Sequence, residues 1–325
     1  DLKIINCLKN NNSRKNKEPL FYWSKDCGNT HAYFTERSIK LLRQNGRFGF
    51  IVPISLVSTD RMDDIRKYIH ENSAEVKYFN FDDRPGKIFS GLEHCRATIV
   101  VTEKGNGVKN VTTSKYHRWF TKDRPDLFKS LRTTIWDVKN PPELVPKLGS
   151  NIEKRILQKL TRKSRGKTLG DFITNDGKPI FYYNAPQYWI HAHPEDYLPK
   201  IEYYERYNES PEKTEKVLAG LRKTKISSHY KPLNFDRDNI PVANAILNSS
   251  MFYWWFIVWS NGRDLLLQQI ASLPIDLDDF PDSLSTKLNP LIEKLMKSYD
   301  ETSNEKINVR SDGNIIRIKE IIPKF

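Results

Sequence analysis

An alternation of helix-like and strand-like segments between residues 31 and 105 is the feature that most restricts how this chain can fold. Segment 31–45 has apolar residues at helical spacing, and Asn45-Gly46 after it favours the end of a helix, because glycine readily adopts left-handed backbone angles. Segment 47–55 is a continuous apolar run of strand length, which is typical of a strand covered on both faces in a parallel sheet. The residues predicted to share one side of the helix are Tyr33, Phe34, Ser38, Leu41 and Leu42.

The same alternation continues towards residue 105. The expected elements are a helix over 60–72 capped by Thr59 or Asp60, a strand over 74–81, a loop over 84–94 and a strand over 95–105. This order corresponds to half of a doubly wound α/β sheet, and nothing before His31 supplies the first strands. We therefore expect an incomplete Rossmann-like sheet in the first domain.

The pattern changes after residue 150, and we expect a second domain there. A basic, aromatic connector over 110–150 closes with a Pro-rich stretch, which is common between domains. The elements expected next are a helix at 151–160, short strands within 172–177, 178–184 and 186–192, helices around 240–270 and 283–299, and a strand within 307–325. This mixture predicts an α+β fold over 151–325, following a first domain with connector over 1–150.

The charge of the chain favours a polyanionic partner. The net charge is +13 and the isoelectric point is about 9.4. Such an excess suits nucleic acid, because each phosphate that Lys or Arg neutralises releases a condensed counterion. A basic protein without any such partner is the alternative that charge alone leaves open.

Other features of the composition limit the class of protein. Cys7, Cys27 and Cys95 are too few and too scattered for a disulfide scaffold or a zinc cluster, so we expect a cytoplasmic, reducing location. The longest apolar run, 251–259, is far below the roughly 18 residues that span a bilayer, so we expect a buried helix there and no membrane partner. The polar N-terminus has no signal-peptide pattern, and the start at Asp1 without Met suggests a piece of a longer protein.

Several segments resemble the adenine-N6 DNA methyltransferases of restriction-modification systems, in the branch of Eco57I-like and TaqI-like enzymes. Segments 31–69 and 87–101 are similar to the stretch that follows the catalytic motif of that family. Further segments are similar to its C-terminal target-recognition domain, namely 186–192, 225–235, 246–256 and 261–275. The resemblance implies the C-terminal half of a methyltransferase-like α/β domain, followed by a domain that recognises double-stranded DNA.

The resemblance also implies S-adenosylmethionine as the cofactor of the parent enzyme, but this sequence lacks the motifs that bind and use it. The Gly-containing cofactor motif of the family has no counterpart. Its Asn/Asp-Pro-Pro-aromatic tetrapeptide is matched only by residues 140–143, where Glu143 has no ring and a Pro-rich linker is the better explanation. We therefore expect no catalytic residue and no bound cofactor in this chain alone. Its expected partner is a missing N-terminal methyltransferase half, on the same polypeptide or on a separate chain.

Phe89 is the strongest candidate for a single functional residue. A base that undergoes chemistry must leave the helical stack, and aromatic faces hold it there. Phe89 lies in the loop between two predicted strands, where the resembling family places its base-stacking ring. A Phe that anchors the loop onto the core is the competing interpretation. By the same resemblance we expect Pro53 and Ser55 to line the adenine pocket, since ligands of open α/β sheets lie at the carboxyl ends of strands. A Pro53 that only ends the strand is the competing interpretation, and the simpler one.

A basic cluster at 221–231 is the candidate for DNA contact. Cations with short hydroxyls and an aromatic ring are a common set of phosphate contacts, although a solvated loop has the same composition. The candidate residues are Arg222, Lys223, Lys225, Ser227, Ser228, His229, Tyr230, Lys231 and, in a separate turn, Arg263. The aromatic residues expected to build the core of the second domain are Tyr188, Trp189, Trp254, Trp255 and Trp259.

His191 and His193 would share one face of a strand and could meet one ion. No third ligand is placed beside them, so we expect no metal site.

These observations predict part of a site-specific DNA adenine-N6 methyltransferase, supplying the flipped-base pocket wall and sequence recognition. One alternative is a non-catalytic DNA-binding specificity module that works with a separate catalytic chain. A second alternative, an RNA or protein methyltransferase, gives no reason for the second domain.

Overall fold

The computed structural model describes residues 21–91, 94–138, 144–204, 222–309 and 315–321, and within them it leaves the side chains of 200–204, 222–225, 305–309 and 315–321 undescribed. The chain divides into two compact units. Unit 1 contains the residues up to Lys163 together with Trp254–Asp264, and unit 2 contains Ser164–Tyr253 and the residues from Leu265 onward. This division differs from the boundary expected after residue 150, because the helix α5 (Asn151–Lys163) and the segment 254–264 both pack with unit 1.

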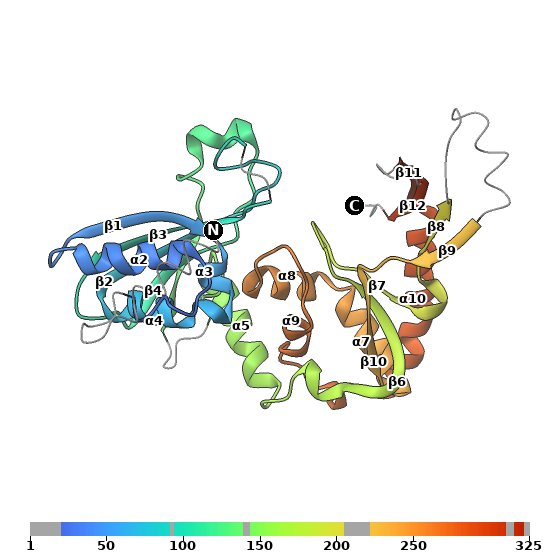
Figure 1. Cartoon of the computed structure of the whole chain (residues 1–325). Helices are drawn as coiled ribbons and strands as arrows, with labels where there is room; N and C mark the ends of the chain where they lie inside the picture. The colour runs from blue at the N-terminus through green and yellow to red at the C-terminus, as the bar shows by residue number, and fades with distance from the viewer. Residues whose placement is uncertain (1–20, 92–93, 139–143, 205–221, 310–314, 322–325) are drawn as a thin grey trace, which may run out of the picture. The chain divides into compact units, whose positions relative to one another are not determined.

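Unit 1 is built on a five-stranded mixed sheet in the order β1-β3-β2-β4-β5 (Figure 1). Strand β3 lies between β1 and β2 and is antiparallel to both, so β1 and β2 run in the same direction. Strand β4 is parallel to β2, and β5 is antiparallel to β4. This mixed α/β architecture is compatible with a methyltransferase-like fold. The strands are β1 (Arg47–Pro53), β2 (Ser73–Phe81), β3 (Ala97–Lys104), β4 (Asn110–Ser114) and β5 (Thr133–Asp137).

The strand predicted at 47–55 is confirmed as β1, but the parallel sheet with both faces covered is wrong. Its only pairing among the described strands is antiparallel, with β3. Successive residues of β1 alternate in burial, since Ile51 is 38% exposed while Val52 is 2% exposed. A continuous apolar run shows that a segment is strand-like, but whether a second layer covers it depends on distant parts of the chain.

The helices of unit 1 follow the predicted order. The helix expected over 31–45 is confirmed as α2 (Thr30–Leu41). Asn29 caps its N-terminus, since the Asn29 side chain accepts a hydrogen bond from the His31 backbone amide at 3.3 Å. The left-handed backbone conformation expected at Asn45-Gly46 is adopted by Asn45, with φ of 61°. The helix expected over 60–72 starts with a 3-10 turn and makes no side-chain cap at Thr59. The remaining helical elements here are α3 (Ser55–Ser58), Asp60–Met62, α4 (Asp63–Glu71), Thr121–Asp126 and α5.

The buried side of α2 differs from the expected one. Phe34 and Leu41 are 63% and 68% exposed, while Glu36 is fully buried. The Glu36 carboxylate accepts hydrogen bonds from the backbone amides of Tyr22 and Ser24, each at 3.0 Å, and lies 2.8 Å from the Lys40 ammonium. A buried carboxylate with several donors turns this face of the helix inward, which an apolar periodicity does not reveal.

Unit 2 combines helices with antiparallel strands in two sheets, ordered β10-β6-β7 and β11-β12-β8-β9 (Figure 1). The two short strands predicted at 172–177 and 178–184 form one continuous strand, β6. This strand pairs with β10 on both sides of a register irregularity at Asn234/Phe235. The strand predicted within 307–325 is confirmed as β12. The strands are β6 (Ile173–Tyr183), β7 (Ala192–Pro194), β8 (Lys200–Tyr204), β9 (Arg222–Ile226), β10 (Tyr230–Phe235), β11 (Ser303–Val309) and β12 (Ile315–Ile321). The helical elements are Leu169–Phe172, Glu195–Tyr197, Arg237–Asn239, α7 (Ile240–Leu247), α9 (Leu267–Ala271), Leu277–Asp279, α10 (Ser283–Glu301) and the first part of α8 (Ser250–Trp259).

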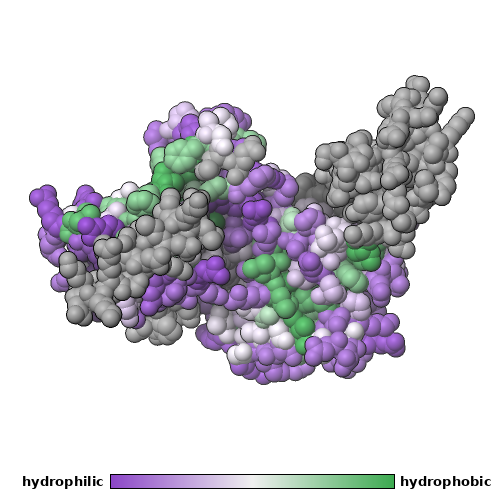
Figure 2. All heavy atoms as spheres, viewed as in Figure 1, coloured by the Kyte–Doolittle hydropathy of each residue, from purple (hydrophilic) through white to green (hydrophobic). Residues whose placement is uncertain are grey.

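On the face drawn in Figure 2, hydrophilic residues cover most of the described surface, interrupted by separate apolar patches. The apolar run at 251–259 is confirmed as a helix, α8, in which Phe252, Trp255, Phe256 and Val258 are buried. Within the described residues, none of the helices has the length and hydropathy needed to span a bilayer.

Candidate functional site

The carboxyl ends of β1 and β2 meet at one edge of the unit 1 sheet. Pro53 at the end of β1 and Phe81 at the end of β2 both pair with Ala97, the first residue of β3. The Ile54 amide also donates to the Arg96 carbonyl at 2.9 Å, which ties the residues after β1 to those before β3. Pro53 and Ser55 are half-buried at this edge. The sheet thus gathers the sequence-predicted pocket residues at the edge where open α/β sheets bind ligands.

Phe89 lies in the loop between β2 and β3, at the same edge. Its side chain is 48% exposed. Its neighbour Ile88 packs instead against a buried cluster of Phe81, Trp119 and Leu127. Ile88 thus anchors the loop onto this cluster, and Phe89 is left half-exposed.

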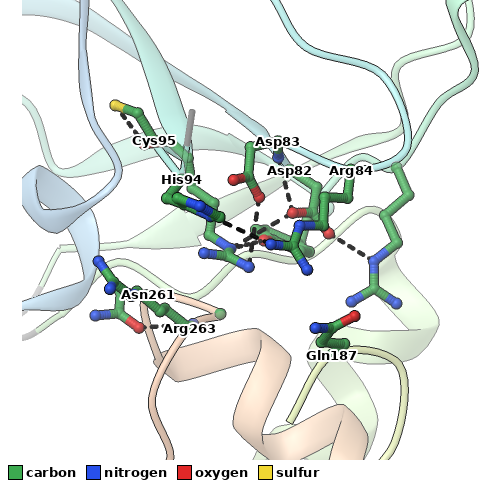
Figure 3. Close-up of polar contacts among 12 residues, drawn as sticks. Asp82, Asp83, Arg84, His94, Cys95, Gln187, Asn261 and Arg263 are labelled. Carbon is green, nitrogen blue, oxygen red and sulfur yellow. Dashed lines mark hydrogen bonds and ion pairs between the residues drawn. The ribbon is translucent and has the colours of Figure 1, made fainter. Parts of the chain in front are cut away.

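A buried ionic network joins the two ends of this loop (Figure 3). Asp82 and Asp83, directly after β2, are 3% and 2% exposed. The Arg118 Nε donates to Asp82 Oδ2 at 2.7 Å, while the Arg96 guanidinium lies 3.4 Å from one oxygen of each carboxylate. Arg96 also donates to the Tyr116 hydroxyl at 2.9 Å. Burial lowers the pKa of Arg96, but Tyr116, Asp83 and Asp82 outweigh it and hold that pKa above its usual value. Arg96 is thus engaged inside the protein and is not available as a phosphate contact.

The same network packs against the turn that carries Arg263, within unit 1. The Asn261 side chain accepts from the Arg263 and Asp264 amides at 2.8 and 3.3 Å, which fixes the turn. Gly262 has φ of +72°, and a Cβ there would lie 2.6 Å from the Tyr116 hydroxyl. The close approach to Tyr116 requires glycine, and it leaves Arg263 with a side chain 62% exposed beside the edge. No local pattern in the sequence signals this long-range contact.

The residues at this edge do not fit S-adenosylmethionine. Gly86 follows β2, but a Cβ on it would meet the Trp119 carbonyl oxygen at 2.7 Å and the Trp119 ring at 2.9 Å. The space that a glycine could leave for a cofactor is therefore filled by Trp119. The segment after β1, 53–55, contains no glycine. Among the described residues of this edge, none is assigned to the cofactor.

The turn between β9 and β10 carries the other predicted contacts, in unit 2. Asn184 holds this turn, since its amide donates to the His229 carbonyl at 2.9 Å and its side-chain oxygen lies 3.0 Å from His229 Nδ1. Ser228, His229 and Lys231 are exposed, and Ser227 and Tyr230 are half-buried. The candidates whose side chains lie outside the described residues are Arg222, Lys223 and Lys225.

His191 and His193 lie together in an aromatic cluster of unit 2. His191 Nδ1 is 2.8 Å from His193 Nε2, and both rings are buried. Burial lowers the pKa of His191 to about 3 and that of His193 to about 4, so both rings are neutral near pH 7. The Tyr230 ring packs on both of them, with centroids 5.7 and 5.6 Å away, which explains why it is half-buried. Across the described part of the chain, no three His, Cys, Asp or Glu side chains converge as metal ligands would.

The predicted aromatic core of the second domain requires correction. Tyr188 is 47% exposed, and Trp254, Trp255 and Trp259 cluster with unit 1 rather than unit 2. Trp189 is half-buried and packs on Tyr299 at 5.1 Å. The sequence does not reveal this division, because the boundary between the units falls within a single helix, α8, between Tyr253 and Trp254. The Asn-Pro-Pro-Glu segment 140–143 lies outside the described residues.

Comparisons with known proteins found similar solved structures and one family model that matches part of the chain. The similar structures include an ATP-dependent Type ISP restriction-modification enzyme, LlaBIII, bound to DNA (13% identity, TM-score 0.29) and the type IIG restriction endonuclease BpuSI (11% identity, TM-score 0.27). They match over 80% and 81% of this chain, which spans only 16% and 44% of theirs. No curated protein sequence matches. Residues 7–89 match the model of the Eco57I restriction-modification methylase family, a region that contains α2, β1, α3, α4, β2 and, at its end, Phe89.

Proposed function

We propose that this chain is part of a site-specific DNA adenine-N6 methyltransferase of a restriction-modification system. It supplies one wall of the pocket that receives a base turned out of the duplex, and it contributes DNA recognition. The observation that carries this proposal is the half-exposed Phe89 ring on an anchored loop, at the carboxyl edge of a sheet within the methylase-like region.

Each residue at the edge has a limited role in this proposal. The Phe89 ring stacks on the extruded adenine, since an aromatic face replaces the neighbouring bases of the duplex. Pro53 and Ser55 line the pocket from the end of β1. Methyl transfer from S-adenosylmethionine is assigned to the N-terminal methyltransferase half, on the same polypeptide or on a separate chain.

We assign DNA contact to one surface segment in each unit. In unit 2 the turn at 227–229 presents short hydroxyls and an imidazole, and Lys231 follows it. In unit 1 the Arg263 side chain is exposed beside the sheet edge. The net charge of +13 supports a polyanionic partner.

The proposed function is tested by the preference of the protein for a duplex in which an adenine is already unpaired. We expect tighter binding when a 2-aminopurine, a fluorescent adenine analogue, lies opposite an abasic site than when it is paired with thymine, because the cost of extrusion is then reduced. Its fluorescence should also fall on binding if the base stacks on a ring. Equal affinity for both duplexes, with unchanged fluorescence, would contradict the base-pocket role.

Replacing Lys223 and Lys225 together by alanine is expected to weaken binding to all duplex sequences alike. The slope of log affinity against log salt should become shallower by about one for each phosphate that the variant no longer neutralises. Titrations of labelled duplex at several salt concentrations measure both effects. A charge-matched control is the double replacement of Lys294 and Lys297, two exposed lysines of α10. If both double variants weaken binding equally, the cluster at 221–231 contributes only general charge.

A further inference from the structure

The segment between β4 and β5 packs beneath the loop that carries Phe89. The His117 amide donates to the Asn80 carbonyl at 2.8 Å, and the Asp82 amide donates to the His117 carbonyl at 2.9 Å. Further along the two segments, the Gly86 amide donates to the Trp119 carbonyl at 2.8 Å. We call residues 117–124 the bracing segment, because its backbone follows the loop from the end of β2 to Gly86.

Arg124, at the end of the bracing segment, contacts the two residues immediately before Phe89. Its Nη2 donates to the Lys87 carbonyl at 2.5 Å and its Nη1 donates to the Ile88 carbonyl at 3.1 Å. The guanidinium also lies over the Trp119 ring, 4.9 Å from its centroid. A planar fork of donors matches two successive carbonyls, and the stacked indole holds the plane of the fork in place.

The position of these contacts connects Arg124 to Phe89. Ile88 is fixed on one side by the cluster of Phe81, Trp119 and Leu127 and on the other by Arg124. The Phe89 backbone follows this fixed residue directly, and Phe89 itself is 48% exposed. The direction in which the side chain leaves the loop is therefore set by the backbone that precedes it.

We propose that Arg124 is a positioning residue that holds the loop of Phe89 so that the ring meets an extruded base. This inference rests on the proposed function. Arg124 does not touch the base; it acts through the Lys87 and Ile88 carbonyls. A ring held in place before binding loses less conformational freedom on binding than a mobile ring, so it discriminates better between an extruded base and a paired one.

The alternative role for an exposed arginine on a basic segment is a direct contact with a phosphate. Three variants separate the two roles. Arg124→Ala removes the fork and the charge. Arg124→Lys keeps the charge but cannot reproduce a planar fork on two carbonyls. Lys129→Ala removes one charge from the same connection between β4 and β5, just after the bracing segment. The Lys129 side chain pairs with Asp126 at 2.8 Å and is 82% exposed.

We expect Arg124→Ala and Arg124→Lys to speed hydrogen exchange of the amides between 86 and 91, and Lys129→Ala to leave it unchanged. The preference for the unpaired 2-aminopurine duplex should fall about threefold to tenfold in both Arg124 variants, as expected for the removal of one or two hydrogen bonds. Unchanged amide exchange in Arg124→Ala would overturn the proposal. So would a preference that Arg124→Lys retains in full, or that Lys129→Ala lowers equally, because charge alone would then explain the effect.

Failure of this inference is distinguishable from failure of the proposed function. If wild-type protein shows no preference for the unpaired base, the base-pocket role fails, and amide exchange still decides whether Arg124 holds the loop. If wild-type protein shows the preference and Arg124→Ala keeps both the preference and the protection, the function stands and the positioning role fails.

Discussion

Replacing Phe89 by alanine is expected to lower the preference for an unpaired adenine analogue by about fivefold to a hundredfold. Stacking an aromatic side chain on an exposed base is worth roughly 1–3 kcal/mol in alanine substitutions, and each 1.4 kcal/mol or so is a factor of ten in affinity. Phe89→Trp should keep most of the preference, because a ring remains. Titrations of the unpaired and the paired 2-aminopurine duplex with each variant measure the ratio.

The control for this experiment is another exposed phenylalanine of unit 1. Phe34 on α2 is 63% exposed, so Phe34→Ala removes a similar area of accessible ring. We expect it to leave the preference unchanged. A packing role for Phe89 predicts a different pattern, in which the melting temperature falls for Phe89→Ala and the preference measured well below that temperature stays at the wild-type value. That pattern would remove Phe89 from the proposed pocket.

Replacing Glu36 by glutamine is expected to destabilise unit 1 by about 2 to 3 kcal/mol, because buried donors lose a charged acceptor. Glu36 is fully buried and accepts from the Tyr22 amide, the Ser24 amide and the Ser24 hydroxyl at 3.0, 3.0 and 2.6 Å. The glutamine side chain offers one oxygen, and its NH₂ group would face these donors. Thermal unfolding should show a fall of roughly 10 °C.

The matched control is Glu71→Gln on α4. Glu71 is 51% exposed and lies 3.9 Å from the Lys67 ammonium, an exposed pair of the kind that contributes about 0–1 kcal/mol. We expect no resolved change in its melting temperature. If Glu36→Gln melts like Glu71→Gln, the Glu36 carboxylate does not organise the start of α2.

The contribution of Glu36 should also depend on pH. Burial raises the pKa of this carboxyl, but hydrogen bonds from Lys40, Ser24 and Tyr22 outweigh it and hold the pKa below its usual value. A carboxyl whose pKa is lower in the folded state contributes stability that is present above its unfolded pKa and lost as pH falls through the folded one. The difference in stability between wild type and Glu36→Gln should therefore be constant near neutrality and shrink below about pH 4.

The sequence by itself was sufficient to identify the elements of the region around β1 and α2. Apolar residues at spacing 3.6 or in a short continuous run reflect interactions within one segment, so α2, β1, β2, the loop at 84–94 and β3 lie near their expected bounds. The same local information placed Pro53, Ser55 and Phe89 after or between the strands, which is why the strand ends gather them at one edge.

Only the tertiary structure decided which side chains face inward and which remain exposed. Ile88 and Phe89 are adjacent and both apolar, yet Ile88 is partly buried against Trp119 and Leu127 while Phe89 is 48% exposed. The outward position of Phe34 depends on Glu36 binding amides of the preceding segment, and the place of Arg263 depends on Gly262 fitting against Tyr116. These contacts join residues far apart in the chain, and their energy depends on distances and on burial that no window of sequence contains. Periodicity therefore determined the elements, and long-range packing determined the site.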